Sequence, residues 1–240
     1  MNIEEVKAQE VGEDSGFFML LYGKAGVGKS SLSSKLGQNV LVLDCEGTAS
    51  LIEGIFRIPV STYEEVVDYK KQFVASEKYD TLVIDGLRSF EVMVEEYVCK
   101  VMGRAEFSAA NAKFGDLYLK KRLIFTKFLE TLIGRGKNVV IISHVAETEK
   151  VDEANDESFM FYEPNLKDKE LKNTLPALSD LVGYLGVEVK DGKSFRRLDL
   201  LPSQNKVCKN RFNIKEVIIG ESPEEIYGKL NDAIVKFYKK

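Results

Sequence analysis

A glycine-rich octapeptide near the start of the sequence has the residue types and spacing to bind phosphate groups. Residues 23–30 read GKAGVGKS and satisfy the pattern G-x-x-x-x-G-K-[ST] at each fixed position. Its glycines let the backbone curl so that N–H groups point inward at a phosphate. Lys29 can then reach the β- and γ-phosphates, and Ser30 can offer its hydroxyl to Mg²⁺. The expected ATP-binding residues are Gly23, Lys24, Ala25, Gly26, Val27, Gly28, Lys29, Ser30 and Ser31.

An aspartate at the end of a predicted buried strand could complete a magnesium site. The apolar run at residues 81–84 ends at Asp85. A carboxylate at such a strand end, beside a phosphate loop, holds the magnesium, usually through water. We therefore expect Ser30 and Asp85 to be the metal-binding residues. Because glycine and a predicted helix follow, Asp85 could instead cap that helix.

Glu46 is the candidate for activating the attacking water. It lies two positions beyond Asp44, which ends the predicted strand at residues 40–43. A carboxylate there can face the γ-phosphate across the strand ends and polarise a water molecule. Asp44 is the alternative candidate for this role, and Glu46 would then be a solvated loop residue.

The single histidine, His144, is also a candidate. With Ser143 it follows the apolar run at residues 138–142. A polar side chain at this position can touch the γ-phosphate and report its loss to the segment that follows. The alternative is a histidine that is satisfied by local hydrogen bonds.

The elements that must position these residues follow from the hydrophobic pattern. Apolar runs alternate with helical periodicity, which predicts an α/β fold with a mainly parallel central sheet flanked by helices. Ser61 with Glu64 forms a capping box, and Ser222 with Pro223 and Glu225 starts a terminal helix after a C-terminal β extension. The predicted strands are residues 17–22, 40–43, 55–60, 81–84, 138–142, 184–189 and 195–201. The other predicted helices start at residues 29 and 61 or span residues 90–101, 117–132 and 178–181.

The length of 240 residues suits one domain, so we expect a single ATPase domain over the whole chain. Residues 1–15 are polar and acidic and are predicted to be a flexible N-terminus rather than a signal peptide. Residues 146–174 are polar with few periodic apolar residues. They predict a long mobile loop.

Composition excludes several classes of protein. The chain has 44% hydrophobic and 30% charged residues and a net charge of −4, which favours a soluble globular protein and makes any nucleic-acid contact local. Scattered cysteines and one histidine argue against a structural zinc site and against a disulfide framework. We expect a cytoplasmic protein, in the host cytoplasm if it is phage-encoded. No apolar run approaches the roughly 20 residues of a membrane span.

These motifs, in this order, resemble the RecA-like P-loop ATPases. Within that class the sequence looks like the phage nucleotide-binding proteins, including the Sak-type single-strand annealing ATPases. The resemblance implies a RecA-like fold, Mg²⁺-dependent ATP hydrolysis in phage-type recombination or replication, and a water-activating role for Glu46. The phrases that carry it span residues 22 to about 187. They are YGKAGVGKSSL, LVLDCEGTASL, YDTLVIDGL, KFGDLYLKKRLIFTKFLETL, VVIISH and LSDLVGYLGV.

Residues 209–212 read KNRF and are similar to the KNRF motif of bacterial RadA and to the K-x-R fingers of related ATPases. That resemblance implies a homo-oligomer with ATP at subunit interfaces, where Lys209 and Arg211 reach the neighbour's site. In an extended segment both side chains lie on one face and could neutralise charge on the phosphoryl group. The glycine that follows KNRF in RadA is missing here, and a solvated basic strand is the alternative.

Single-stranded DNA is an expected partner, mostly because of the family resemblance, and a single-strand binding protein is a further candidate. Basic residues outnumber acidic ones over residues 190–215, which could track a phosphate backbone. The segment after His144 is acidic, which is the wrong sign for DNA. Its aromatic residues could stack on bases or cover the sheet edge. They are Phe159, Phe161 and Tyr162.

Three other functions remain open. A dimeric ATPase switch of the MinD and ParA class would use Lys24 as its signature lysine, although Ala25 replaces a glycine of that motif. A nucleotide kinase usually carries an arginine-rich lid, and the segment after His144 has no arginine. A non-enzymatic nucleotide switch would follow if Glu46 is not catalytic.

Overall fold

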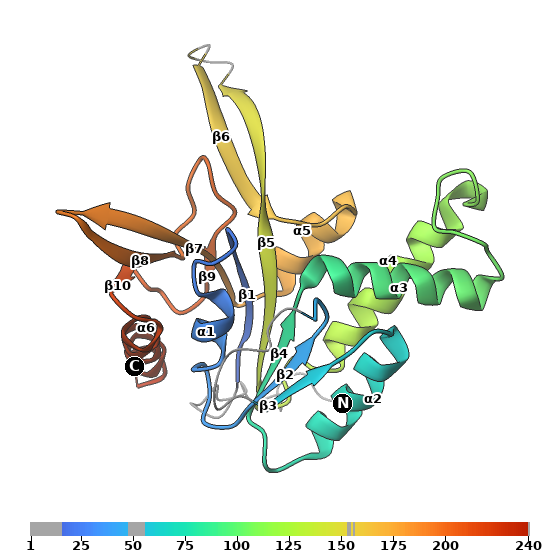
Figure 1. Cartoon of the computed structure of the whole chain (residues 1–240), viewed down its shortest axis with the longest axis horizontal. Helices are drawn as coiled ribbons and strands as arrows, with labels where there is room; N and C mark the ends of the chain where they lie inside the picture. The colour runs from blue at the N-terminus through green and yellow to red at the C-terminus, as the bar shows by residue number, and fades with distance from the viewer. Residues whose placement is uncertain (1–15, 48–55, 153–154, 156, 240) are drawn as a thin grey trace, which may run out of the picture.

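The computed structural model describes residues 16–47, 56–152, 155 and 157–239, so the predicted flexible N-terminus lies outside the described residues. A mainly parallel sheet forms the centre of the molecule, with helices on both faces (Figure 1). Its strands are β1 (Phe18–Gly23), β2 (Val40–Asp44), β3 (Phe56–Pro59), β4 (Thr81–Asp85), β5 (Asn138–Asp152), β6 (Glu157–Pro164), β7 (Leu181–Lys190), β8 (Lys193–Asp199), β9 (Lys209–Asn210) and β10 (Ile218–Gly220). Its helices are α1 (Lys29–Ser33), α2 (Tyr63–Ala75), α3 (Leu87–Met102), α4 (Asp116–Glu130), α5 (Lys169–Leu178) and α6 (Pro223–Tyr238), with a 3₁₀ turn at Lys113–Gly115.

The strand order in the described part of the chain is β10-β8-β7-β1-β5-β4-β2-β3. Strands β7, β1, β5, β4, β2 and β3 run parallel, whereas the β7–β8 and β8–β10 pairings at one edge are antiparallel. The predicted α/β class, its C-terminal β extension and its terminal helix are therefore confirmed. Because these strands are parallel, β1, β2 and β4 end at the same edge of the sheet, and β5 crosses that edge partway along its length. Ligands bind at this edge in such folds.

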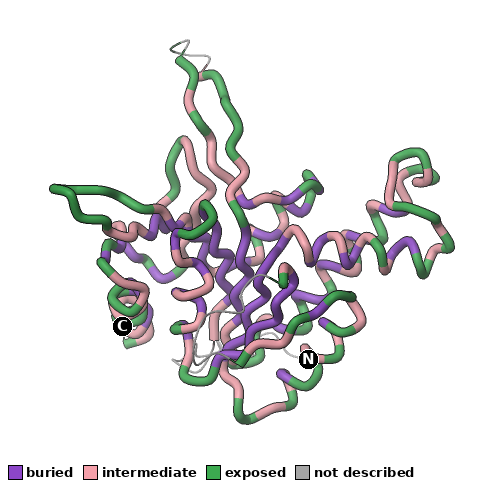
Figure 2. The backbone as a smooth tube through the Cα atoms, in the orientation of Figure 1, coloured by how far each residue is buried: buried purple, intermediate pink, exposed green. Residues whose placement is uncertain are grey.

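Strand alternation divides the core into two layers. Phe18, Leu20 and Tyr22 point to one face of β1, where they pack with residues of α2, α3, α4 and α5. Met19 and Leu21 point to the other face, toward α1 and α6. The central strands are almost fully buried, as the purple tube in Figure 2 shows. Burial on both faces explains why these strands read as continuous apolar runs in the sequence.

The N-termini of α2 and α6 can be compared with the capping residues predicted for them. Ser222 caps α6 by accepting a hydrogen bond from the Glu225 N–H at 3.2 Å, as predicted, with Pro223 in the first turn. The capping box of α2 is displaced by one residue from the prediction, because Thr62 and Glu65 form it. The carboxylate of Glu65 also accepts from the N–H of Ser61 at 2.8 Å, so Ser61 contributes to the cap without being the N-cap residue.

The prediction of a long mobile loop over residues 146–174 is wrong. Strand β5 continues past the sheet, pairs antiparallel with β6 from Val145↔Pro164 to Asp152↔Glu157, and leads through Asn165–Asp168 into α5. The short helix predicted at residues 178–181 is α5, which ends where that helix was expected to start. Figure 1 shows the β5–β6 hairpin extending away from the body of the molecule. Both of its faces meet solvent, so its strands lack the apolar alternation that reveals a half-buried strand.

The aromatic residues of the hairpin have partners within the chain. The Tyr162 ring lies 5.5 Å from the Tyr184 ring, and its backbone oxygen accepts a hydrogen bond from the Tyr22 hydroxyl at 3.1 Å. The Phe161 ring lies 3.3 Å beneath the Lys150 ammonium. Tyr162 therefore covers the sheet edge at the base of the hairpin.

A buried ion network fastens the base of this hairpin to the helices. Lys121 on α4 is 1% exposed, and its ammonium lies 3.0 Å from Glu91 and 3.3 Å from Asp168. Glu91 on α3 also accepts the N–H groups of Lys167 and Asp168 at 3.1 Å. Burial opposes ionisation of Glu91, but its contacts with Lys121 outweigh this and lower the pKa of Glu91. The network joins α3, α4 and the start of α5.

Replacing Lys121 by methionine is expected to lower the free energy of unfolding by about 3–5 kcal/mol, because it leaves buried carboxylates without their cation. Denaturant unfolding measures this difference. The exposed neighbour Lys120, changed to methionine, is the matched control and should shift stability by no more than about 0.5 kcal/mol. Equal stability of the two variants would contradict a structural role for the network.

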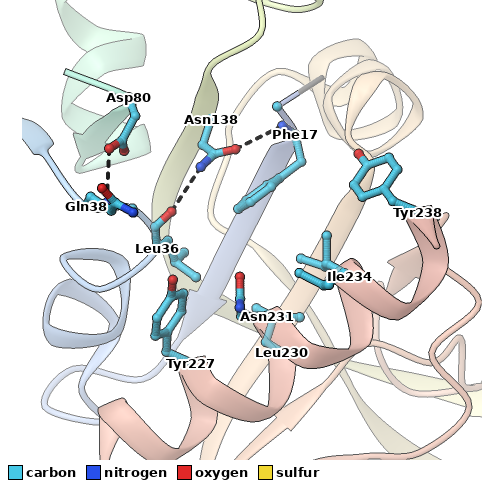
Figure 3. Close-up of a pocket in the computed structure, with 13 residues that line it drawn as sticks. Phe17, Leu36, Gln38, Asp80, Asn138, Tyr227, Leu230, Asn231, Ile234 and Tyr238 are labelled. Atoms are coloured by element: carbon cyan, nitrogen blue, oxygen red, sulfur yellow. Dashed lines mark hydrogen bonds between the residues drawn. The ribbon is translucent and has the colours of Figure 1, made fainter. Parts of the chain in front are cut away.

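A hollow at the opposite edge of the sheet supports the fold rather than the phosphate loop. It has a volume of about 360 Å³ and lies between α6 and the amino ends of the strands (Figure 3). Asn138 joins its walls, accepting from the Phe17 N–H at 3.2 Å and donating to the Leu36 oxygen at 3.1 Å. Asp80 is held by the N–H groups of Gln38 and its neighbour Asn39. These bonds tie the segment after α1 to the strand starts.

Candidate functional site

The phosphate loop lies between β1 and the short helix α1, at the carboxyl edge of the sheet. Gly26 has φ 77° and Gly28 has φ 98°, in the left-handed region that only glycine adopts without strain. Gly28 is required for a second reason, since a Cβ there would lie 2.9 Å from Nε of Arg196 on β8. Lys24, Ala25 and Gly26 are exposed, whereas the Val27 side chain is buried against the core.

Lys29 is buried within its own loop. Its ammonium donates to the backbone oxygens of Gly23 at 3.0 Å and Lys24 at 2.7 Å. Burial lowers the pKa of Lys29, and the nearby carboxylates of Asp85 and Glu46 oppose that shift. The loop therefore holds a cation at its mouth, fixed by backbone groups, where a phosphate would need it.

Ser30 and Asp85 meet where α1 approaches the end of β4. The Ser30 hydroxyl donates to Oδ2 of Asp85 at 2.7 Å. Burial raises the pKa of Asp85, while the Ser30 hydrogen bond lowers it and the negative charge of Glu46 raises it further. One hydroxyl and one carboxylate are hard oxygen donors of the kind that Mg²⁺ prefers, with the remaining positions left to phosphate and water. The residues therefore fit a magnesium ion that is held jointly with a nucleotide.

Glu46 and His144 lie opposite each other above the phosphate loop. Oε2 of Glu46 is 3.4 Å from Nε2 of His144, and in the β1–β5 register His144 stands beside Gly23. Gly86 makes room for Glu46, because a Cβ on Gly86 would lie 2.5 Å from the Glu46 Cγ. The structure thus brings together the predicted base, the predicted sensor and the loop.

Asp44 shapes the turn that carries Glu46. Its Oδ1 accepts the N–H of Glu46 at 3.1 Å and the N–H of Gly47 at 2.9 Å. Asp44 itself is 4% exposed. Both observations favour a supporting role for Asp44 and the catalytic role for Glu46.

Two arginines near the site were missed by sequence reasoning. Arg57 on β3 has Nε 3.4 Å from Asp44 and a terminal nitrogen 3.5 Å from Asp85. Arg196 packs against Gly28 and donates to the Glu221 oxygen at 2.8 Å. Neither belongs to a motif, and a single arginine outside a motif gives no signal in one sequence. Arg57 is engaged by these two carboxylates.

Lys24 points away from the phosphate loop toward the β5–β6 hairpin. Its ammonium lies 2.8 Å from Glu147, and its side chain is 58% exposed. The hydrogen bond and charge of Glu147 raise the pKa of Lys24. This pair is a direct contact between the loop and the hairpin.

Lys209 and Arg211 do not lie in the chain's own phosphate site. Asn210 between them pairs with Leu181 at the amino end of β7, level with Met19 and about four residues, or roughly 13 Å, from the loop end of β1. Both reach the carboxyl end of α5, where Lys209 donates to the Ala177 oxygen at 2.7 Å and Arg211 to the same oxygen at 3.3 Å. Arg211 also pairs with Asp180 at 2.9 Å. The predicted common face of the two cations is therefore present, but its partners in this chain are those of α5 and Asp180.

The basic stretch over residues 190–215 is divided among separate places. Lys190 and Lys193 form the last cross-strand pair of the β7–β8 hairpin and are exposed. Asp199 holds two others, Arg197 at 2.8 Å and Lys206 at 2.6 Å. Lys209 pairs with Val182 at the amino end of β7, so strand pairing divides this stretch between the two ends of β7.

Comparison with protein families identifies the chain. The AAA_24 family, an AAA domain, matches residues 15–212, which include the phosphate loop, Glu46, Asp85 and His144. The chain belongs to this family. A curated relative, the SPbeta prophage-derived uncharacterized protein YorG of Bacillus subtilis, is 26% identical over 140 residues. That match covers 56% of this chain and spans only 43% of the relative's length.

Three solved structures are similar in fold at low sequence identity. The KaiC-like protein of Pyrococcus horikoshii has a TM-score of 0.44 at 15% identity, with 77% of each chain covered. The flagellar accessory protein FlaH of Methanocaldococcus jannaschii has a TM-score of 0.40 at 12% identity, covering 85% of this chain and 84% of that one. The RadB recombinase has a TM-score of 0.47 at 13% identity, covering 88% and 90%. The AAA_24 domain has an α/β fold with a mainly parallel central sheet, and none of its described helices has the length and apolar character to cross a bilayer.

Proposed function

We propose that this AAA_24 domain binds ATP with Mg²⁺ and hydrolyses it. The observation that carries the proposal is the meeting of five side chains at one sheet edge. Lys29 stands at the loop mouth, the Ser30 hydroxyl touches Asp85, and Glu46 faces the loop across from His144. In this arrangement Lys29 binds phosphate, Ser30 and Asp85 hold the metal, and Glu46 polarises the attacking water.

The metal supplies charge neutralisation between the phosphates when it is bound. The protein's own residues supply the rest. Glu46 accepts a proton from water, and His144, within 3.4 Å of its carboxylate, is placed to orient that carboxylate and to sense the terminal phosphate. The β5–β6 hairpin continues from His144 and contacts Lys24 through Glu147, so a change at the phosphate can be passed to the hairpin.

We further propose that the ATPase acts on single-stranded DNA in phage-type recombination or replication, as the Sak-type annealing proteins do. The prophage origin in the name of its relative supports a phage setting. The test is ATP turnover with and without a single-stranded oligonucleotide, at several salt concentrations. Stimulation that falls steeply with salt supports DNA as the partner. Turnover that is unaffected by DNA, in a protein that binds no labelled oligonucleotide at low salt, removes it.

The second candidate is a dimeric switch of the MinD and ParA class, favoured by the exposure of Lys24. Its ammonium is held at the surface by Glu147 and could cross to another subunit. The mass of the protein in solution, measured with and without ATP, separates the candidates, because a switch of this class would form an ATP-dependent dimer without needing single-stranded DNA.

The assembly proposal is that ATP lies at subunit interfaces and that Lys209 and Arg211 complete a neighbour's site. Their distance from the chain's own loop supports an action between subunits. Arg211→Ala protein is expected to bind ATP but be nearly inactive, and mixing it with Lys29→Ala protein should restore part of the turnover. A mixed interface then joins an intact loop to an intact finger.

Two control measurements accompany this experiment. Denaturant unfolding of Arg211→Ala reports whether loss of the Asp180 contact merely destabilises the chain. Mass measurement of the mixture shows whether mixed oligomers form. If mixed oligomers form without restored turnover, or if a strict monomer turns ATP over fully, then Lys209 and Arg211 do not complete a neighbour's site.

A further inference from the structure

Arg57 occupies the centre of the carboxylate group behind the phosphate loop. It comes from β3, whose register with β2 sets Arg57 beside Val42 and Pro59 beside Asp44. Its side chain is 13% exposed, and its guanidinium lies 3.4 Å from Asp44 and 3.5 Å from Asp85. Asp44 and Asp85 are themselves paired residues at the ends of β2 and β4. One cation therefore bridges two adjacent strand ends.

Arg57 is held by ion pairs rather than by a complete set of hydrogen bonds. Its Nε is buried and has no hydrogen-bond partner among the described residues. A buried cation in this state is costly unless opposite charges compensate it. Asp44 and Asp85 supply that compensation, and Glu46 adds a third carboxylate to the cluster. The arginine is thus placed to balance the carboxylates that the site needs.

Asp44 links Arg57 to the predicted base. One Asp44 oxygen, Oδ2, faces Arg57, while the other, Oδ1, accepts the N–H groups of Glu46 and Gly47. The orientation of this carboxylate therefore decides the geometry of the turn. Gly86 closes the opposite side of Glu46. Glu46 is held between the Asp44 turn and Gly86.

We propose that Arg57 is a positioning residue of the ATPase site, which fixes Glu46 through Asp44 and limits the negative charge around Asp85. The inference rests on the proposed ATP hydrolysis and adds a role that no motif assigns. No hydrogen bond or ion pair joins Arg57 to Lys29 or Ser30 in the described part of the chain, so its loss should spare nucleotide binding. Two consequences follow, one for turnover and one for divalent cations.

Arg57→Met is expected to reduce kcat roughly tenfold or more, the scale of a displaced catalytic group, with KM for ATP nearly unchanged. It should also bind Mn²⁺ more tightly without nucleotide, because Asp44 and Asp85 lose their compensating charge. Arg57→Lys retains the charge and should keep the Mn²⁺ affinity of the wild type while recovering part of kcat. Arg135→Met, at an exposed loop arginine, is the matched control and should change neither value.

The experiment measures steady-state turnover and, separately, free Mn²⁺ by electron paramagnetic resonance, with unfolding curves for every variant. Asp44→Asn is the second variant, and the double change with Arg57→Met should be little worse in kcat than either single change, since both act on one turn. Unchanged kcat in Arg57→Met, or fully additive losses in the double variant, would overturn the proposal. If the wild type does not hydrolyse ATP, the proposed function fails, while the Mn²⁺ comparison still decides the charge role. Equal Mn²⁺ affinity in Arg57→Met and wild type would then reject it.

Discussion

Lys29→Ala protein is expected to lose tight ATP binding. The Lys29 ammonium is buried at the mouth of the loop and held by the oxygens of Gly23 and Lys24, so it is already oriented for phosphate. A hydrogen bond to a charged group is worth about 1.5–3 kcal/mol. The loss of two such contacts with the β- and γ-phosphates predicts that the Kd rises by roughly 10²-fold or more. Calorimetric titration with ATP and Mg²⁺ measures it.

The matched control is Lys35→Ala, which removes a surface lysine just beyond α1. Lys35 is 46% exposed and pairs with Glu224 at 3.4 Å. Its removal should leave the Kd for ATP nearly unchanged. If Lys29→Ala and Lys35→Ala bind ATP equally well, the nucleotide site lies elsewhere and the assignment of residues 23–31 fails.

Glu46→Gln protein should bind ATP as the wild type does but turn it over about 10²-fold more slowly or worse, the scale of lost general-base catalysis. Glutamine keeps the size of the side chain and its approach to Gly86, but it cannot accept the proton from water. Single-turnover hydrolysis with excess enzyme isolates this chemical step from binding and release.

Two further variants decide between the acidic candidates. Glu77→Gln, at an exposed site after α2, controls for the loss of one negative charge and should have normal turnover. Asp44→Asn should be less damaging than Glu46→Gln, because the Asp44 carboxylate supports the turn rather than facing the loop. A mild Glu46→Gln beside a crippled Asp44→Asn would transfer the role of base to Asp44.

The Lys24–Glu147 contact offers a route from phosphate to hairpin. The phosphate loop and the hairpin are far apart in sequence, yet an ion pair at 2.8 Å joins them. The hairpin base is fastened in turn to α3 and α4 by Lys121. If Lys24 moved toward a bound phosphate, its ion pair with Glu147 would break, while the Lys121 contacts at the base of the hairpin would remain. The hairpin therefore has both a fixed base and a contact that a nucleotide can compete for.

The sequence by itself determined the phosphate loop, the parallel strands and the ends of several helices. These signals are local. Glycine at positions 26 and 28 meets a backbone requirement for positive φ within the loop, and Ser222 caps α6 by accepting the N–H of Glu225, three residues on. The apolar strands are recognisable because burial on both faces demands an unbroken run. Since parallel strands end together, the motif order also predicted that Glu46, Asp85 and His144 meet.

Only the tertiary structure decided the surroundings of that site. The β5–β6 hairpin is stabilised by strand pairing between polar segments, and pairing leaves no apolar period when both faces meet solvent. Arg57 depends on the β2–β3 register, and Arg196 on the β7–β8 pairing that carries it to Gly28. The pairing of β9 with β7 likewise places Lys209 and Arg211 at the amino end of β7. Contacts between distant strands follow from register, which one residue type at one position does not encode.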